Sequence, residues 1–196
     1  MEFYVIPHLS GSLEVLLSFQ KRHNISPQKI ILAGNMIGRV GAKKMLNYLK
    51  EYWHEYMAVL TGPVENSFIN WNFSSLQSPP MLPAEIFAEI ESDDTWISIM
   101  QNYLSKLPFE YNIGSIYINA NGKYNLGNNI FRPACQIDLP ENIKIEPIEN
   151  SIILEPNIEN RDHEILMNYS IEKNIGKKTI YLPDQRENFS GVKIIL

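Results

Sequence analysis

The order of apolar segments in the first 60 residues is the feature that most constrains the fold. Residues 3–6 are β-branched and aromatic, which favours a strand, and leucines at helical spacing follow over residues 13–20. A second strand is predicted at residues 29–33 (KIILA), where positions 30–33 are apolar in succession, as in a strand that is covered on both faces. A second helical stripe spans residues 45–53, and a third strand is predicted at 56–60. This alternation with short glycine turns predicts an α/β fold with parallel strands.

The second half of the chain changes character. Helical spacing continues through residues 86–90 and 96–107, and Pro108 ends the second of these predicted helices. From residue 131 onward helix signals fade. Short strands are predicted at residues 115–119, 143–145, 151–154, 164–167, 179–182 and 192–196. The pattern therefore predicts an α/β first half followed by a mostly β second half.

Composition narrows the class of protein. The chain of 196 residues matches one domain, so we expect residues 1–196 to form a single domain. A net charge of −5 argues against nucleic acid or an anionic membrane as a partner bound by charge alone. One cysteine, Cys135, excludes a disulfide framework and a zinc-thiolate cluster. The N-terminus has no signal-peptide pattern and no apolar run is long enough to span a membrane, so we expect a cytoplasmic location.

Three segments follow the predicted parallel strands in order: residues 4–11 (YVIPHLSG), 30–40 (IILAGNMIGRV) and 59–65 (VLTGPVE). They resemble the GDxHG, GDxxDRG and GNHE blocks of the calcineurin-like metallophosphoesterases of the serine/threonine phosphatase type. Residues 105–122 and 165–170 resemble two later blocks more weakly, whereas 66–100 and 125–160 match none. The resemblance implies a metallophosphoesterase-like sandwich of two mixed β-sheets flanked by helices.

The functional side chains of that family are mostly replaced in this chain. The positions that match the family's metal ligands and catalytic groups are His8, Ser10, Asn35, Gly38, Pro63, Val64, Asn119 and Tyr169. Arg39 and Glu65 alone keep the family's residue type, and the family's matching arginine binds the substrate phosphate.

A two-metal hydrolase must neutralise two divalent cations roughly 3.5–4 Å apart, which requires anionic, bridging oxygen ligands. Asn35 is neutral, and Pro63 and Val64 have no donor atom in their side chains. We therefore expect no metal centre, no cofactor and no hydrolysis by the family's route. The resulting hypothesis is a catalytically inactive phosphatase-like protein, a pseudophosphatase, that acts as a protein-binding, scaffold or regulatory subunit.

Two alternatives remain. Arg39 lies in a glycine-flanked loop at the predicted carboxyl edge of the sheet, where it could hold a phosphorylated ligand or nucleotide; otherwise it is a surface residue, or pairs with Glu65 to join two loops. Asp162, His163 and Glu164 are the densest group of metal-ligand types, and with Glu65 they could form a relocated metal site. The competing interpretation of 162–164 is a solvated charged turn.

An aromatic segment follows the third block. Phe68, Trp71 and Phe73 alternate with Asn and Ser, a composition typical of protein-binding surfaces. The competing interpretation is a segment that caps the core. If these side chains line an exposed patch, their replacement by alanine should abolish partner capture without lowering the melting temperature.

Overall fold

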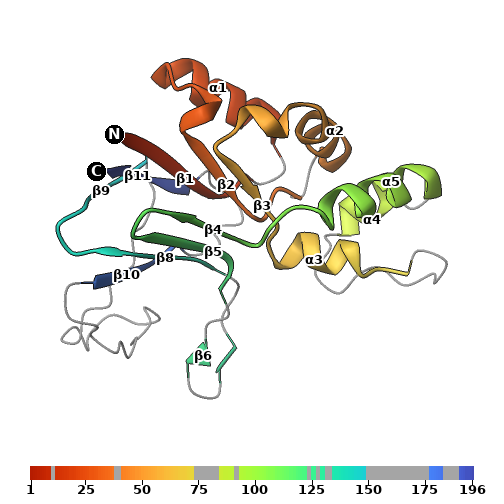
Figure 1. The fold of residues 1–196 in the computed structure, drawn as a ribbon. Helices are drawn as coiled ribbons and strands as arrows, with labels where there is room; N and C mark the ends of the chain where they lie inside the picture. Colours follow the sequence, from red (N-terminus) through yellow and green to blue (C-terminus); the bar gives the residue numbers. More distant parts are fainter. Residues whose placement is uncertain are drawn as a thin grey trace.

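Helices and two β-sheets make up the fold in the computed structural model (Figure 1). The structure describes residues 1–9, 12–37, 41–72, 84–90, 93–122, 125–126, 129–130, 134–148, 177–182 and 190–196. The prediction of an α/β fold with two sheets is confirmed.

The first sheet has five strands and is mixed. Its order is β3 (Ala58–Leu60), β2 (Ile30–Ala33), β1 (Glu2–His8), β11 (Ser190–Ile195) and β9 (Lys144–Pro147). The first three strands pair in parallel, which requires the crossover connections that helices provide here, and β11 runs antiparallel between β1 and β9. The three parallel strands occupy the positions that the sequence pattern predicts to within about two residues.

The second sheet has four strands and is antiparallel throughout. Its order is β10 (Lys177–Leu182), β8 (Ala134–Pro140), β5 (Ile116–Gly122) and β4 (Glu110–Ile113). A separate short pair consists of β6 (Asn125–Leu126) and β7 (Asn129–Ile130). The expectation of two mixed sheets is therefore wrong for this sheet. The β4–β5 connection is a tight turn through Gly114, and such a turn can join only antiparallel strands.

The helices of the described chain gather on one face of the five-stranded sheet (Figure 1). They are α1 (Leu13–His23), α2 (Ala42–Tyr52), α3 (Pro63–Ile69), α4 (Ala84–Ile90) and α5 (Asp94–Leu104), with short 3-10 turns η1 (Pro27–Lys29) and η2 (Trp53–Glu55). The α1 helix begins where the Ser12 hydroxyl accepts a hydrogen bond from the Val15 N–H, at 3.3 Å. It ends at Asn24, which adopts a left-handed conformation with φ of 52°. No helix in the described ranges has the length and apolar character needed to cross a membrane.

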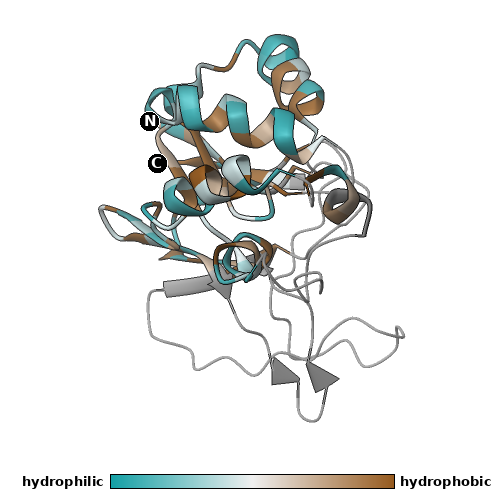
Figure 2. Ribbon diagram, turned by 90° about the vertical axis from the view of Figure 1, so that its right-hand side faces the viewer, coloured by the Kyte–Doolittle hydropathy of each residue, from teal (hydrophilic) through white to brown (hydrophobic). Residues whose placement is uncertain are grey.

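The five-stranded sheet separates two apolar cores, and the hydropathy colours of Figure 2 show brown residues concentrated along it. Successive residues of a strand point to opposite faces, so Ile30 and Leu32 face the helices while Ile31 and Ala33 face the second sheet. All four residues of β2 are buried, as the uninterrupted apolar run predicts. The two sheets thus pack face to face, with Ile118 and Ile137 of the second sheet in the shared core.

The aromatic segment that the sequence suggests as a binding surface belongs to the helical core instead. Phe68 is 0% exposed and Trp71 8%. The Phe68 ring lies 6.1 Å from the Trp96 ring, measured between centroids, and 6.4 Å from that of Trp71. The Gln101 side-chain amide donates hydrogen bonds to the carbonyls of Phe68 (2.8 Å) and Trp71 (2.9 Å). The protein-binding prediction is therefore wrong for these two residues, and Phe73 lies outside the described residues.

Replacing Phe68 by alanine should lower the free energy of unfolding by about 3–5 kcal/mol, because the change empties a fully buried ring site. Urea denaturation followed by circular dichroism measures this loss. Phe109→Ala is the matched control and should have a small effect, since the Phe109 side chain is 49% exposed. An unchanged urea midpoint for Phe68→Ala would contradict the burial of this side chain.

Candidate functional site

The carboxyl ends of the central parallel strands meet at one edge of the five-stranded sheet, where ligands of α/β proteins usually bind. His8 is the last residue of β1, and the loop after β2 begins at Gly34. The Leu9 N–H donates to the Asn35 carbonyl at 3.4 Å, which brings the positions of the first two sequence blocks together. The third block continues from β3 into α3.

Two glycines let the loops after β2 and β3 approach each other. Gly34 has φ of 88°, in the left-handed region that favours glycine. A Cβ atom at this position would lie 2.8 Å from the Cα of Gly62 and 3.3 Å from the Cβ of Ala120. The backbones of the two loops are therefore in direct contact, and the end of β5 lies against them.

The loop after β2 forms a concave set of backbone donors. Asn35 follows Gly34 in the left-handed region with φ of 49°, so the N–H groups of residues 35, 36 and 37 converge. Such successive N–H groups, called a nest, form a binding site for an anion. In this protein the anion is the carboxylate of Glu65 on α3.

The Glu65 carboxylate joins the two loops through four hydrogen bonds. Its Oε1 accepts from the N–H groups of Met36 (2.7 Å) and Ile37 (2.9 Å), and its Oε2 accepts from those of Asn35 and Gly62 (2.9 Å each). The bond to Gly62 also caps the first turn of α3, where Glu65 is the third residue.

Glu65 is 0% exposed. Burial raises the pKa of this carboxyl, because it disfavours the charged form, and the backbone N–H donors oppose the rise by stabilising that form. An ionised carboxylate has about four acceptor positions, and four N–H groups occupy them here. The geometry thus commits Glu65 to the backbone and leaves it no acceptor position for a metal ion.

The neighbouring positions that the structure describes, Asn35, Pro63 and Val64, supply no charge. Pro63 and Val64 are half-buried at the start of α3 and carry no side-chain donor atom. Asn35 is 6% exposed, and its Oδ1 atom has no hydrogen-bond partner in the part of the chain that the structure describes. The described strand ends therefore present one neutral acceptor without a partner, Asn35 Oδ1, and one carboxylate, Glu65, whose acceptor positions are filled by backbone N–H groups.

Asn119 does not join this group. Its neighbour Ala120 faces the core between the sheets, so the Asn119 side chain lies on the opposite face of β5. There its amide nitrogen donates to the Tyr117 hydroxyl at 3.2 Å. Placing Asn119 at the strand-end site is therefore wrong, because strand alternation turns it away.

The remaining predicted positions lie outside the described residues: Ser10, Gly38, Arg39, Tyr169 and the group Asp162, His163 and Glu164. The structure describes only the backbone of His8. Within the described ranges, no three His, Cys, Asp or Glu side chains gather in a way that could hold a metal ion. Cys135 is 2% exposed between the sheets, where burial raises the pKa of its thiol.

The sequence leaves a pairing of Glu65 with Arg39 open as one alternative and does not predict the link between Glu65 and the backbone of the β2 loop. One sequence signal does identify the local part of the arrangement. In Gly62-Pro63-Val64-Glu65, proline suits the first helical position and glutamate the third, which is a helix-start pattern. The contact with residues 35–37 requires the tertiary structure.

Comparison of the chain with protein-family models, curated proteins and solved structures finds no significant match.

Glu65→Gln should destabilise the protein by at least about 3 kcal/mol, because the glutamine NH2 group would face two backbone N–H donors and leave them unsatisfied. Chemical denaturation at neutral pH measures the change. Glu55→Gln, on the exposed η2 turn, is the matched control and should leave the midpoint unchanged. Equal stabilities of the two variants would rule out a structural role for the Glu65 carboxylate.

Gly34→Ala should cost about 2–4 kcal/mol, because it combines an unfavourable positive φ with a Cβ atom placed 2.8 Å from backbone. Gly114→Ala provides the comparison: φ there is 60° and nothing lies within 4 Å of the added Cβ. Its cost should be confined to the backbone conformation, about 1 kcal/mol. The difference between the two midpoints measures the close approach of the two loops, and its absence would contradict that approach.

Proposed function

We propose that this protein is a catalytically inactive phosphatase-like protein, a pseudophosphatase with a metallophosphoesterase-like fold, that acts by binding another protein as a scaffold or regulatory subunit. The observation that carries the proposal is the engagement of Glu65 by four backbone N–H groups at the strand ends.

The donor set at the strand ends supports the absence of hydrolysis. Two divalent cations in one site repel each other strongly, and carboxylates offset that repulsion by bridging them. The described positions supply the neutral amide of Asn35, the apolar Pro63 and Val64, and a carboxylate whose acceptor positions are filled. These described positions by themselves supply too little negative charge to assemble the two ions of a two-metal mechanism.

The filled nest also bears on the alternative of a sensor for phosphorylated ligands. The N–H groups of residues 35–37 are the donors that a phosphate would need, and Glu65 already holds them. A phosphate entering this nest would meet a buried negative charge. The sensor alternative therefore rests on Arg39, which lies outside the described residues.

The step to protein binding is an elimination, because a fold does not by itself specify a function. If the strand-end site lacks the charge that metal chemistry needs, the function must rest on binding at the surface of the molecule. The net charge of −5 disfavours nucleic acid as the partner and leaves protein as the class to test first.

We expect the purified full-length chain to contain far less than one metal ion per molecule, and to show no turnover of p-nitrophenyl phosphate when manganese is added. Elemental analysis and absorbance measure the two results. We further expect affinity capture from the source organism to yield a protein that, once purified, co-elutes with this chain in a fixed stoichiometry.

Stoichiometric metal together with turnover would replace the proposal by the relocated-site enzyme. Stabilisation by nucleotides or phosphopeptides that is lost in Arg39→Ala would favour the sensor. Failure of every captured protein to form a complex of fixed stoichiometry would contradict the scaffold role.

A further inference from the structure

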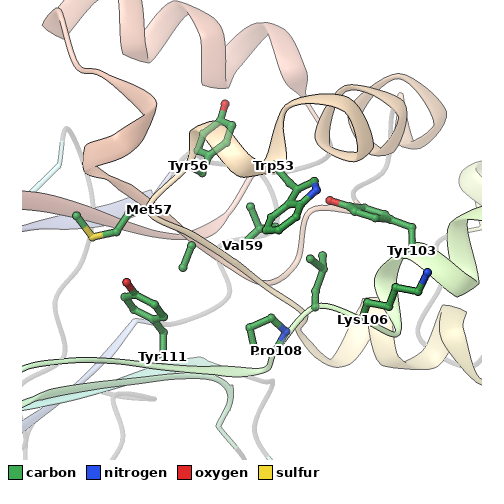
Figure 3. A pocket seen from close by; sticks show the side chains of 10 residues that line it. Trp53, Tyr56, Met57, Val59, Tyr103, Lys106, Pro108 and Tyr111 are labelled. Atoms are coloured by element: carbon green, nitrogen blue, oxygen red, sulfur yellow. The ribbon is translucent and has the colours of Figure 1, made fainter.

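A pocket of about 310 Å³ lies beside β3, and the residues of the strand-end site do not line it (Figure 3). One wall comes from η2 and β3, over residues 53–59, and the other from the end of α5 and the start of β4, over residues 103–111. Both β3 and β4 stand at the end of the strand order in their sheets. The pocket is therefore formed where the two edges of the sandwich lie one above the other.

The walls of the pocket are mainly aromatic and apolar. Trp53 and Tyr56 contribute rings from one side, and Tyr103 and Tyr111 contribute rings from the other, with Pro108 between the latter two (Figure 3). Its volume is at the lower end of the range found for small-molecule sites. Flat ring systems suit such walls, because aromatic faces pack against each other in stacked or edge-on arrangements.

Tyr103 gives this apolar pocket an unused hydrogen-bond donor. Its hydroxyl is buried and has no hydrogen-bond partner among the described residues. Burial raises the pKa of Tyr103, so the hydroxyl stays protonated at neutral pH. A buried hydroxyl without a partner costs stability. A ligand with an acceptor group would remove that cost.

Lys106 adds a positive charge at the same end of the pocket. It follows Tyr103 by three residues in the turn that closes α5, where the Lys106 N–H donates to the Tyr103 carbonyl at 3.1 Å. Residues three apart in such a turn lie on the same side. Figure 3 shows the Lys106 side chain on the Tyr103 side of the pocket with its ammonium directed away from the cavity, and this exposed, flexible side chain can turn toward the Tyr103 hydroxyl. In the described chain this ammonium has no ion-pair partner.

We propose that this pocket binds a small molecule with one or two flat apolar rings and an anionic group, with the rings among Trp53, Tyr56 and Tyr111 and the anion at Tyr103 and Lys106. This site is separate from the strand ends and goes beyond the proposed protein binding. A carboxylate and a phosphate ester share the required chemistry, since each carries negative charge and accepts hydrogen bonds.

Trp53 controls access to the donor. The Tyr103 hydroxyl points toward the indole of Trp53 (Figure 3), which shields it. Trp53 belongs to a 3-10 turn of three residues and its side chain is 47% exposed, so the indole has solvent on one side into which it can move. A shift of this one side chain admits the anionic group to the hydroxyl.

Three probes test the proposal on the isotope-labelled full-length chain: 2-naphthoate, 2-naphthyl phosphate and the neutral 2-naphthalenemethanol. We expect saturable chemical-shift changes confined to residues 53–59 and 103–111 with at least one anionic probe, and weaker binding of the alcohol. The tighter of the two anions identifies the anionic group as carboxylate or phosphate ester.

The variants separate the two parts of the site. Tyr103→Phe and Lys106→Gln should each weaken the anionic probe by about fivefold or more, while leaving the neutral probe unchanged. Trp53→Ala should weaken all three probes. Tyr4→Phe and Lys50→Gln, which lie outside the pocket, should change none. Tyr103→Phe should also unfold at a higher urea concentration than the wild type, which distinguishes lost binding from lost folding.

Several results would overturn the proposal. They are the absence of saturable binding for both anions, shift changes located outside the pocket, equal binding of the neutral and anionic probes, or unchanged anion binding in both Tyr103→Phe and Lys106→Gln. None of these outcomes bears on whether a protein partner exists, so the two proposals fail independently.

Discussion

The carboxylate of Glu65 is the group on which the carboxyl edge of the first sheet depends. Three converging N–H groups of the β2 loop would otherwise be buried without partners, and each would cost free energy. A single internal anion satisfies all three and the first N–H of the α3 start as well. The loop conformation, with two successive left-handed residues at Gly34 and Asn35, is therefore matched to a side chain located 30 residues away.

This arrangement decides what the strand ends can do chemically. An α/β sheet commonly offers backbone donors and a cleft for a ligand at this edge. Here the donors are already used, and the two glycines bring the neighbouring loops into backbone contact. In its described part, this edge of the sheet therefore holds the two loops together and offers no free backbone donors from residues 35–37 to a ligand. The proposed protein binding and the proposed pocket therefore rely on other surfaces of the molecule.

The pocket beside β3 has the opposite character. The Tyr103 hydroxyl in its wall has no hydrogen-bond partner among the described residues, Trp53 is partly open to solvent, and the Trp53 indole extends from a short 3-10 turn. An unsatisfied buried group reduces stability, so the unpaired Tyr103 hydroxyl in the wall of this pocket supports the proposal of a ligand that pairs with it. The nest, whose donors are occupied by Glu65, thus has a structural role, whereas the pocket is the proposed ligand-binding part of the molecule.

Periodicity in the sequence determined the parallel strands and the helices that join them, because apolar spacing at two or 3.6 residues depends on neighbours along the chain. Strand β2 shows this directly, since its unbroken apolar run corresponds to burial on both faces. Composition and periodicity did not reveal α3. Pro63 occupies the first position of this helix, which takes Phe68 into the core. Only the tertiary structure decided four other features. They are the antiparallel second sheet, the orientation of Asn119, the hydrogen bonds of Glu65 with residues 35–37, and the pocket between β3 and β4. Each of these features depends on contacts between residues that are distant in the sequence. Each also depends on which face of a strand or helix packs against the neighbouring element.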